Sequence, residues 1–161
     1  VINTGLESLT GKRIKKLEKF FYKNENFFLT YGDGVSNVNL KKLLKLHNEK
    51  KAYLTLTAVH PPARFGELVE KQGRVLSFEE KPQTSVGLIN GGFMIFNRNL
   101  MDYLSVDESC DFESSALEKL VAKGEVMVYK HTGYWGCMDH ERDVEHLNSL
   151  WNNNNAFWRI W

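Results

Sequence analysis

Apolar and polar positions along the first third of the chain alternate with the periods of helices and strands. Apolar residues recur at helical spacing over residues 9–22, with lysines between them, which predicts a helix with Thr10 available as its cap. The continuous apolar run at 27–31, ended by Gly32-Asp33-Gly34, predicts a buried strand followed by a loop. Asn39 can cap a second helix. Its predicted core face consists of Leu40, Leu43, Leu44 and either Leu46 or His47.

The remaining pattern continues the alternation and adds a small antiparallel part. Residues 53–59 are rich in strand formers, and residues 67–70 and 74–78, separated by Gln72-Gly73, predict a hairpin. An apolar strand at 87–97 contains paired glycines. Helix, helix, strand and helix follow at residues 99–104, 112–123, 126–129 and 139–150. This order predicts an α/β fold with a mixed sheet flanked by helices.

Composition narrows the class of protein. With 161 residues and 42% hydrophobic content, one compact domain over residues 1–161 is expected, with a polar turn at 152–155 before an aromatic tail within residues 152–161. The 21 basic and 20 acidic residues nearly cancel, so a small ligand is favoured over nucleic acid or a membrane surface. No apolar run approaches the length needed to cross a bilayer, and the first residues show no leader pattern, which favours a cytoplasmic protein. Cys110 and Cys137 are interpreted as reduced thiols, with a disulfide between them left open.

Two aspartates are candidates for a metal site. Asp33 lies between two glycines directly after an apolar strand, where a loop of an α/β sheet can face a ligand. Asp139 lies just before the last predicted helix. Each has an ordinary alternative, an Asp-Gly turn for Asp33 and a helix cap for Asp139. Two carboxylates from distant parts of the chain are nevertheless what Mg²⁺ needs if it is also to hold phosphate oxygens and water.

Other polar groups fit an anionic substrate. Lys81, held before Pro82, can place a point charge on a phosphate, and Arg64 can contact a phosphate through two hydrogen bonds. Asn90-Gly91-Gly92 interrupts an apolar strand, as bare backbone near a ligand or a β-bulge would. Solvated strand ends and surface loops are the alternatives for Lys81 and Arg64. The five histidines have no zinc-site spacing, so no transition metal is assigned.

Six segments, taken in chain order, carry a resemblance to a known family. They are 10–14 (TGKRI), 28–35 (FLTYGDGV), 61–66 (PPARFG), 78–82 (FEEKP), 89–93 (INGGF) and 138–139 (MD). On the basis of these six segments, the chain resembles the glucose-1-phosphate cytidylyltransferases of the sugar nucleotidylyltransferase superfamily over almost its whole length. It departs from that family at Lys12 and Ala63, where the family has glycine, and at His140, where it has threonine.

The resemblance implies a fold and a reaction. The fold is the Rossmann-like α/β type of nucleotide-diphospho-sugar transferases, and the reaction joins CTP and glucose 1-phosphate into CDP-glucose and pyrophosphate, for deoxysugar or surface polysaccharide biosynthesis. By this analogy Asp33 and Asp139 hold Mg²⁺ and act with Lys81 in catalysis, Lys81 gripping the sugar phosphate. The implied substrate-binding residues, from the base to the sugar pocket, are Thr10, Gly11, Arg64, Gly66, Glu80, Asn90 and Gly91. A homo-oligomer is expected.

The family's glycine-rich loop, which holds the nucleoside triphosphate, has no counterpart here. The chain, which starts at Val1 without an initiator methionine, is therefore interpreted as the C-terminal two-thirds of an N-terminally truncated nucleotidylyltransferase, inactive until the rest is supplied. Two alternatives stay open. One is a metal-dependent glycosyltransferase of similar architecture, and the other is a non-catalytic subunit that binds a sugar phosphate and regulates a partner.

Overall fold

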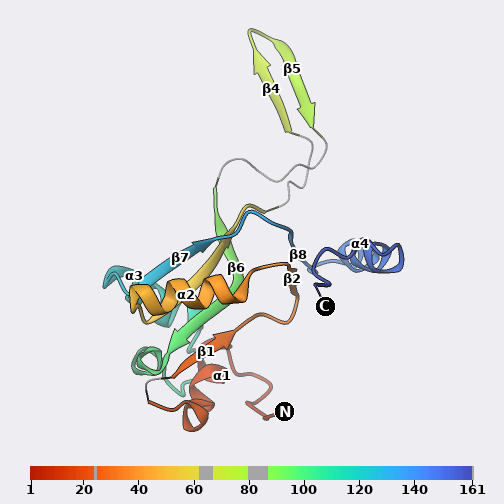
Figure 1. The fold of residues 1–161 in the computed structure, drawn as a ribbon. Coiled ribbons are helices and arrows are strands. Elements are labelled where there is room, and N and C mark those ends of the chain that lie inside the picture. The colour runs from red at the N-terminus through yellow and green to blue at the C-terminus, as the bar shows by residue number, and fades with distance from the viewer. Residues whose placement is uncertain (24, 62–66, 80–86, 161) are drawn as a thin grey trace. The chain divides into compact units, whose positions relative to one another are not determined.

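The computed structural model describes residues 1–23, 25–61, 67–79 and 87–160 (Figure 1). Contacts between Cα atoms divide the chain into two compact units. The first unit consists of Val1–Thr30, Asn39–Thr57 and Gly92–Tyr129. The second consists of Tyr31–Val38, Ala58–Gly91 and Lys130–Trp161. The expectation of a single domain over residues 1–161 stays a prediction.

A four-stranded sheet forms the centre of the first unit, and three of its strands extend by one to three residues into the second (Figure 1). Its order is β1 (Asn26–Leu29), β6 (Ile89–Asn97), β3 (Leu54–Val59) and β7 (Val126–Lys130). β1 and β6 pair antiparallel, with Phe28 opposite Ile95. The predicted mixed α/β fold with helices flanking a sheet is thereby confirmed.

The predicted helix over residues 9–22 is in fact two shorter pieces. α1 spans Thr10–Lys16 and a 3₁₀ helix spans Glu18–Phe20. They separate at Leu17, whose backbone N–H bonds back to Ile14 and Lys15. Thr10 is the first helical residue rather than the cap, and the preceding Leu9 has no side-chain acceptor to offer.

α2 (Leu40–Lys50) begins where the sequence predicts, because the Asn39 side chain accepts a hydrogen bond from the backbone N–H of Lys42 at 2.9 Å. The predicted core face is narrower in the structure. Leu43 and His47 are buried, whereas Leu40, at the first turn, is 46% exposed. Leu40 is the first residue of the helix, and its helical spacing alone does not determine whether its side chain is buried.

His47 joins three elements of the first unit. Its Nδ1 lies 2.8 Å from the Thr55 hydroxyl on β3, and its Nε2 lies 3.2 Å from Oδ1 of Asn26 on β1. An amide oxygen only accepts, so Nε2 carries the proton and Nδ1 accepts from Thr55. Burial lowers the pKa of His47 below its usual value, which keeps the ring neutral.

Short helices after β6 complete the first unit. A 3₁₀ helix spans Arg98–Tyr103, a π-helix spans Phe112–Leu117, and α3 spans Glu118–Ala122. The single helix predicted over residues 112–123 thus changes its hydrogen-bonding pattern midway, and Gly124, at φ +73°, follows its end. The largest fully buried apolar side chains of this unit are Phe96, Phe112, Leu43, Leu54, Met94, Ile95, Leu100, Met101 and Leu120.

Two antiparallel strand pairs and one helix build the second unit. β4 (Glu67–Lys71) and β5 (Arg74–Glu79) form the predicted hairpin, with Gln72 and Gly73 both at positive φ. β2 (Gly34–Ser36) and β8 (Trp135–Cys137) form a second pair, which the sequence pattern did not reveal.

The last helix, α4 (Glu141–Asn152), starts two residues later than predicted. Two of its large apolar side chains are not part of a core, since Val144 is 37% exposed and Trp151 is 44% exposed. The polar turn predicted after the helix is confirmed, with Asn154 at φ +57°. The aromatic tail folds back within the second unit, where the rings of Phe157 and Trp158 lie 5.5 and 5.7 Å from that of Tyr134.

The neutral His47 makes the stability of the first unit depend on pH. Because its pKa is lowered in the folded state, the unfolded chain binds an additional proton once the pH falls through the ordinary histidine value. The free energy of unfolding should therefore fall between pH 7.5 and pH 5.5, and fall less in His47→Gln, which keeps an amide donor and acceptor but does not titrate. Urea unfolding at both pH values measures the difference, and equal losses in the two proteins would contradict this account.

Candidate active site

The two candidate metal-binding aspartates are brought together by the β2–β8 pair. Gly34 lies opposite Cys137 in the register, so Asp33 immediately precedes one end of the ladder and Asp139 follows it by two residues. The backbone N–H of Met138 donates to the carbonyl of Asp33 at 2.9 Å and extends the ladder beyond its last strand pair. Both aspartates are exposed. Residues more than a hundred positions apart thus share one strand end.

The pKa of the Cys137 thiol is influenced by the negative charge of this region. Its thiol donates to Oδ2 of Asp139 at 3.2 Å. Burial, then the hydrogen bond and charge of Asp139, and then the charges of Asp143 and Asp33 raise the pKa of Cys137 to about 11. Three carboxylates are therefore close enough to disfavour a further anion here.

The two candidate aspartates offer oxygen donors, the kind that a hard divalent cation prefers. Within the described residues, no group of three or more His, Cys, Asp or Glu side chains has a metal-binding arrangement. Two exposed carboxylates suit Mg²⁺, which takes few protein oxygens and completes its shell with phosphate oxygens and water. The accumulated negative potential around Asp33 and Asp139 would favour such a cation.

The predicted sugar-pocket residues Asn90 and Gly91 are attached to the same part of the second unit. The Asn90 amide donates to the Tyr31 hydroxyl at 3.4 Å, two residues before Asp33. The buried indole N–H of Trp135 on β8 donates to the carbonyl of Gly91 at 2.8 Å. One strand of the aspartate ladder is thereby fixed to the interrupted strand β6.

Thr10 and Gly11 belong to the first unit and have structural partners there. The Thr10 hydroxyl accepts from the backbone N–H of Phe112 at 3.0 Å and lies 3.2 Å from a carboxylate oxygen of Asp111. A Cβ at Gly11 would lie 2.8 Å from the Cys110 carbonyl, so only glycine fits. Lys12, which replaces a family glycine, is buried and forms an ion pair with Glu108.

Four predicted site residues, Arg64, Gly66, Glu80 and Lys81, lie outside the described residues. Conversely, sequence reasoning did not single out Trp135, Cys137 or Asp143. A possible signal for Cys137 was its place two residues before Asp139, because alternate residues of a strand share a face. Trp135 and Asp143 carried no such signal, since their contacts depend on the long-range strand pairing and the helix start.

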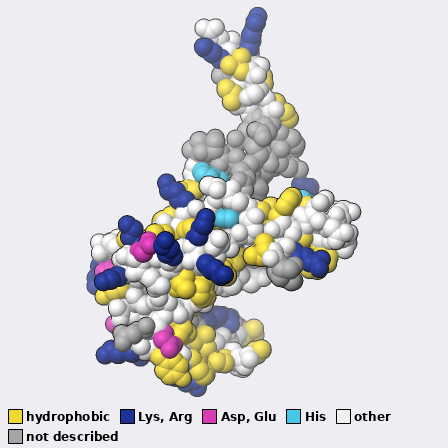
Figure 2. All heavy atoms as spheres, in the orientation of Figure 1, with side chains coloured by type: hydrophobic (Ala, Val, Ile, Leu, Met, Phe, Trp, Pro, Cys, Tyr) yellow, Lys and Arg dark blue, Asp and Glu magenta, His cyan; other side chains and the backbone are white. Residues whose placement is uncertain are grey.

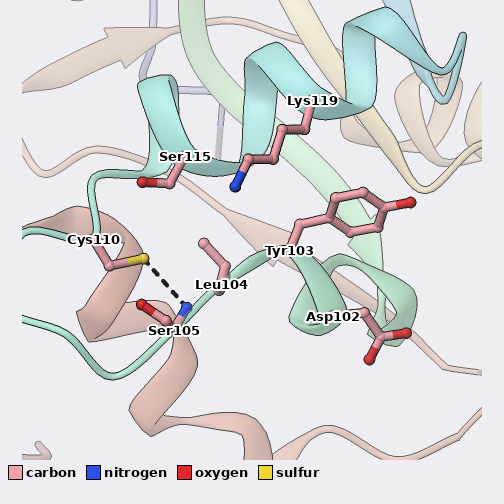
Figure 3. Close-up of a pocket in the computed structure, with 7 residues that line it drawn as sticks. All are labelled: Asp102, Tyr103, Leu104, Ser105, Cys110, Ser115 and Lys119. Atoms are coloured by element: carbon pink, nitrogen blue, oxygen red, sulfur yellow. Dashed lines mark hydrogen bonds between the residues drawn. The ribbon is translucent and has the colours of Figure 1, made fainter.

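A separate hollow of about 280 Å³ lies in the first unit (Figure 3). Lys119, on α3, and Leu104 both line this hollow (Figure 3). The Cys110 sulfur accepts a hydrogen bond from the backbone N–H of Ser105 at 3.4 Å (Figure 3). None of the predicted site residues lines it. Its mixed lining of one ammonium, one carboxylate and hydroxyls does not match the paired-carboxylate chemistry of the second unit.

A larger hollow of about 560 Å³ is lined by Lys23, Lys51 and Arg98 together with Asn26, Asn97 and Asn99, and it contains none of the predicted site residues. On the face drawn in Figure 2, Lys and Arg side chains are interspersed with apolar and neutral ones. Among the described residues, no helix combines the length and apolar character needed to cross a bilayer.

Residues 8–158 match the model of a family described as nucleotidyl transferase. The match includes both aspartates of the β2–β8 ladder. The chain belongs to the nucleotidyl transferase family. The interpretation of the six sequence segments as those of a nucleotidyltransferase is confirmed.

The curated relatives of this chain are named for different activities. A glucose-1-phosphate cytidylyltransferase of Salmonella typhimurium is 38% identical over 161 residues, which is 100% of this chain and 62% of that protein. A D-glycero-α-D-manno-heptose 1-phosphate guanylyltransferase of Aneurinibacillus thermoaerophilus is 38% identical over 115 residues, covering 68% of this chain and 48% of that protein. The chain thus spans less than two thirds of these curated relatives.

The solved structure of the inositol-1-phosphate CTP transferase from T. maritima has the same fold. Its TM-score is 0.64 at 17% sequence identity, and the match covers 98% of this chain and 65% of that one. At this identity the likeness concerns the fold alone. It nevertheless agrees with the nucleotidyl transferase family match over nearly the whole chain.

The surroundings of Cys137 give a prediction that does not depend on turnover. Because Asp139 contributes to the raised pKa of the thiol, Asp139→Asn should lower that pKa and increase alkylation of Cys137 by iodoacetamide at pH 8.5 by about threefold or more. Peptide mass spectrometry of timed samples gives the rate at this cysteine. Glu145→Gln, on an exposed position of α4, is the control and should leave the rate unchanged. An unchanged rate in Asp139→Asn would refute the described contact.

Proposed function

We propose that the protein containing this chain transfers a cytidylyl group from CTP to α-D-glucose 1-phosphate. An oxygen of the sugar phosphate attacks the α-phosphorus of CTP, the bond to the β-phosphate breaks, and CDP-glucose and pyrophosphate form. The placement of Asp33 and Asp139 at the same end of the β2–β8 ladder is the observation that carries this proposal. The similarity to the cytidylyltransferase of Salmonella typhimurium, which covers 100% of this chain and 62% of that protein, supports the choice of substrates.

Charge is the main obstacle in this reaction, because both substrates are anions. Mg²⁺ bound at Asp33 and Asp139 would supply charge neutralisation between the two phosphate groups. The two carboxylates would hold the cation from the segments that flank the same end of the β2–β8 ladder. No covalent enzyme intermediate is needed, so the protein contributes mainly by positioning the substrates.

The remaining proposed residues bind the two substrates. Lys81 grips the sugar phosphate as a point charge, and Arg64 adds a planar phosphate contact. Glu80, Asn90 and the backbone around Gly66 and Gly91 line the sugar pocket. Their hydrogen bonds to hydroxyls would reject analogues that lack these hydroxyls. Asn90 and Gly91 are well suited to this task, since Tyr31 and Trp135 restrain them.

The relatives differ in the nucleotide that they use, because they include both cytidylyl- and guanylyltransferases. Thr10 and Gly11 are proposed to lie beside the base. Cytidine is favoured because the similarity to the cytidylyltransferase extends over 100% of this chain, against 68% for the guanylyltransferase. The expected homo-oligomer and cytoplasmic location stay predictions. The relatives give no support to the glycosyltransferase or the non-catalytic subunit.

The proposal is tested by pyrophosphate release from CTP, glucose 1-phosphate and Mg²⁺ in the natural polypeptide that contains residues 1–161. Asp33→Asn or Asp139→Asn should lower the rate by about 100-fold or more, because a neutral amide cannot hold the cation beside two phosphates. Asp102→Asn, at the hollow of the first unit, is the matched control and should stay within about twofold of the unchanged protein.

Substituting GTP, ATP or dTTP for CTP in the same assay tests the base. Release of a free nucleotide in place of pyrophosphate would indicate the glycosyltransferase alternative. Full activity in both aspartate variants would refute the site itself. Absence of turnover with every nucleotide, together with retained binding of glucose 1-phosphate, would favour the non-catalytic subunit.

A further inference from the structure

Asp139 is held from two directions by side chains that the proposed function does not use. The Cys137 thiol donates to its Oδ2 at 3.2 Å. Oδ2 of Asp143 accepts from the backbone N–H groups of Asp139 and His140, at 3.1 and 3.0 Å. Oδ1 of Asp139 receives no hydrogen bond from the described residues. Among the described residues, one oxygen of the carboxylate therefore accepts a hydrogen bond and the other accepts none.

We propose that Asp143 and Cys137 are positioning residues, which orient the Asp139 carboxylate so that its Oδ1 is presented to a divalent cation. The inference rests on the proposed function, since it assigns the means by which one of the two cation-holding carboxylates is kept in place. It adds two residues that touch neither substrate nor reacting atoms.

Asp143 acts on the backbone. It stands at the third position of α4, where a carboxylate can reach back to N–H groups that have no partner within the helix. By binding the N–H groups of both Asp139 and His140, it fixes the direction in which the chain leaves β8 and enters α4. The direction of the Asp139 Cα–Cβ bond is thereby fixed in the absence of a ligand.

Cys137 acts on the side chain. Cys137 and Asp139 are alternate residues, so they can share a face at the end of β8. A thiol is a weak donor, but its hydrogen bond to a carboxylate is strengthened by the charge of the acceptor. Asp139 is exposed, and without this bond its carboxylate would rotate freely and lose entropy each time a cation bound.

In this proposal Asp143 positions Asp139 and is not a third ligand of the cation. Its Oδ2 already accepts two backbone hydrogen bonds, and the described residues include no metal-binding group of three. Its contact with helix N–H groups also stabilises α4, so a loss of activity alone would not distinguish positioning from helix capping. The dependence of the rate on Mg²⁺ concentration does distinguish them.

The test compares Cys137→Ala and Asp143→Ala with Cys137→Ser and Asp143→Asn in the natural polypeptide. The alanine variants lose the contact, whereas serine keeps a donor and asparagine keeps an acceptor. The Mg²⁺ concentration for half-maximal pyrophosphate release should rise about threefold in Cys137→Ala and about tenfold in Asp143→Ala, because partners of metal ligands commonly contribute this much to metal affinity. Both conservative variants should stay within about twofold, and saturating Mg²⁺ should restore most of the rate.

Direct binding of Mn²⁺, followed by electron paramagnetic resonance, gives a readout without substrates, and Glu145→Gln serves as the surface control. A role in folding alone would lower the thermal midpoint of the alanine variants and leave their Mg²⁺ and Mn²⁺ dependence unchanged, which would overturn the proposal. If Asp143→Ala does not fold, Cys137→Ala decides the question, since it removes only a sulfur atom at a partly exposed position. The proposed function fails separately, if Asp33→Asn and Asp139→Asn keep full activity.

Discussion

The pairing of β2 with β8 is the constraint on which the candidate site depends. It contains only three residue pairs, extended by the hydrogen bond from Met138 to Asp33. An isolated two-stranded ladder of this length is at best marginally stable, so its surroundings must hold it. Trp135 does so by bonding to Gly91, and the Ser36 hydroxyl does so by donating to the Tyr134 carbonyl at 2.6 Å. The geometry at Asp33 and Asp139 therefore depends on contacts made by the other strand residues.

Local pattern was sufficient for elements that satisfy their own hydrogen bonds or begin with a strong signal. α2 was predicted from Asn39 and its apolar spacing, and the β4–β5 hairpin was predicted from Gln72-Gly73. The order of helices and strands was also sufficient for the α/β class. The family could be predicted because its segments recur in order, although none of them is specific alone.

The sequence could not predict what depends on distant partners. β2 and β8 have three residues each, too few to show a period, and within the described part of the chain each pairs only with the other. The helix predicted over residues 9–22 breaks at Leu17, which the apolar spacing does not mark. Thr10 was expected to cap a helix, yet its hydroxyl serves Phe112 a hundred residues away. The expectation that Asp33 and Asp139 lie at one site came from the family resemblance, because nothing in either local segment indicates the other.

Charge balance connects the ladder to the proposed chemistry. The whole chain has a formal net charge of only +1, yet Asp33, Asp139 and Asp143 all contribute to raising the pKa of Cys137. Among the described residues, neither Asp33 nor Asp139 forms an ion pair with a cationic side chain. A phosphate approaching these carboxylates would meet repulsion from both. A divalent cation reverses that sign and adds attraction for the phosphates of both substrates. In the proposed reaction the cation must therefore arrive before the nucleotide or together with it.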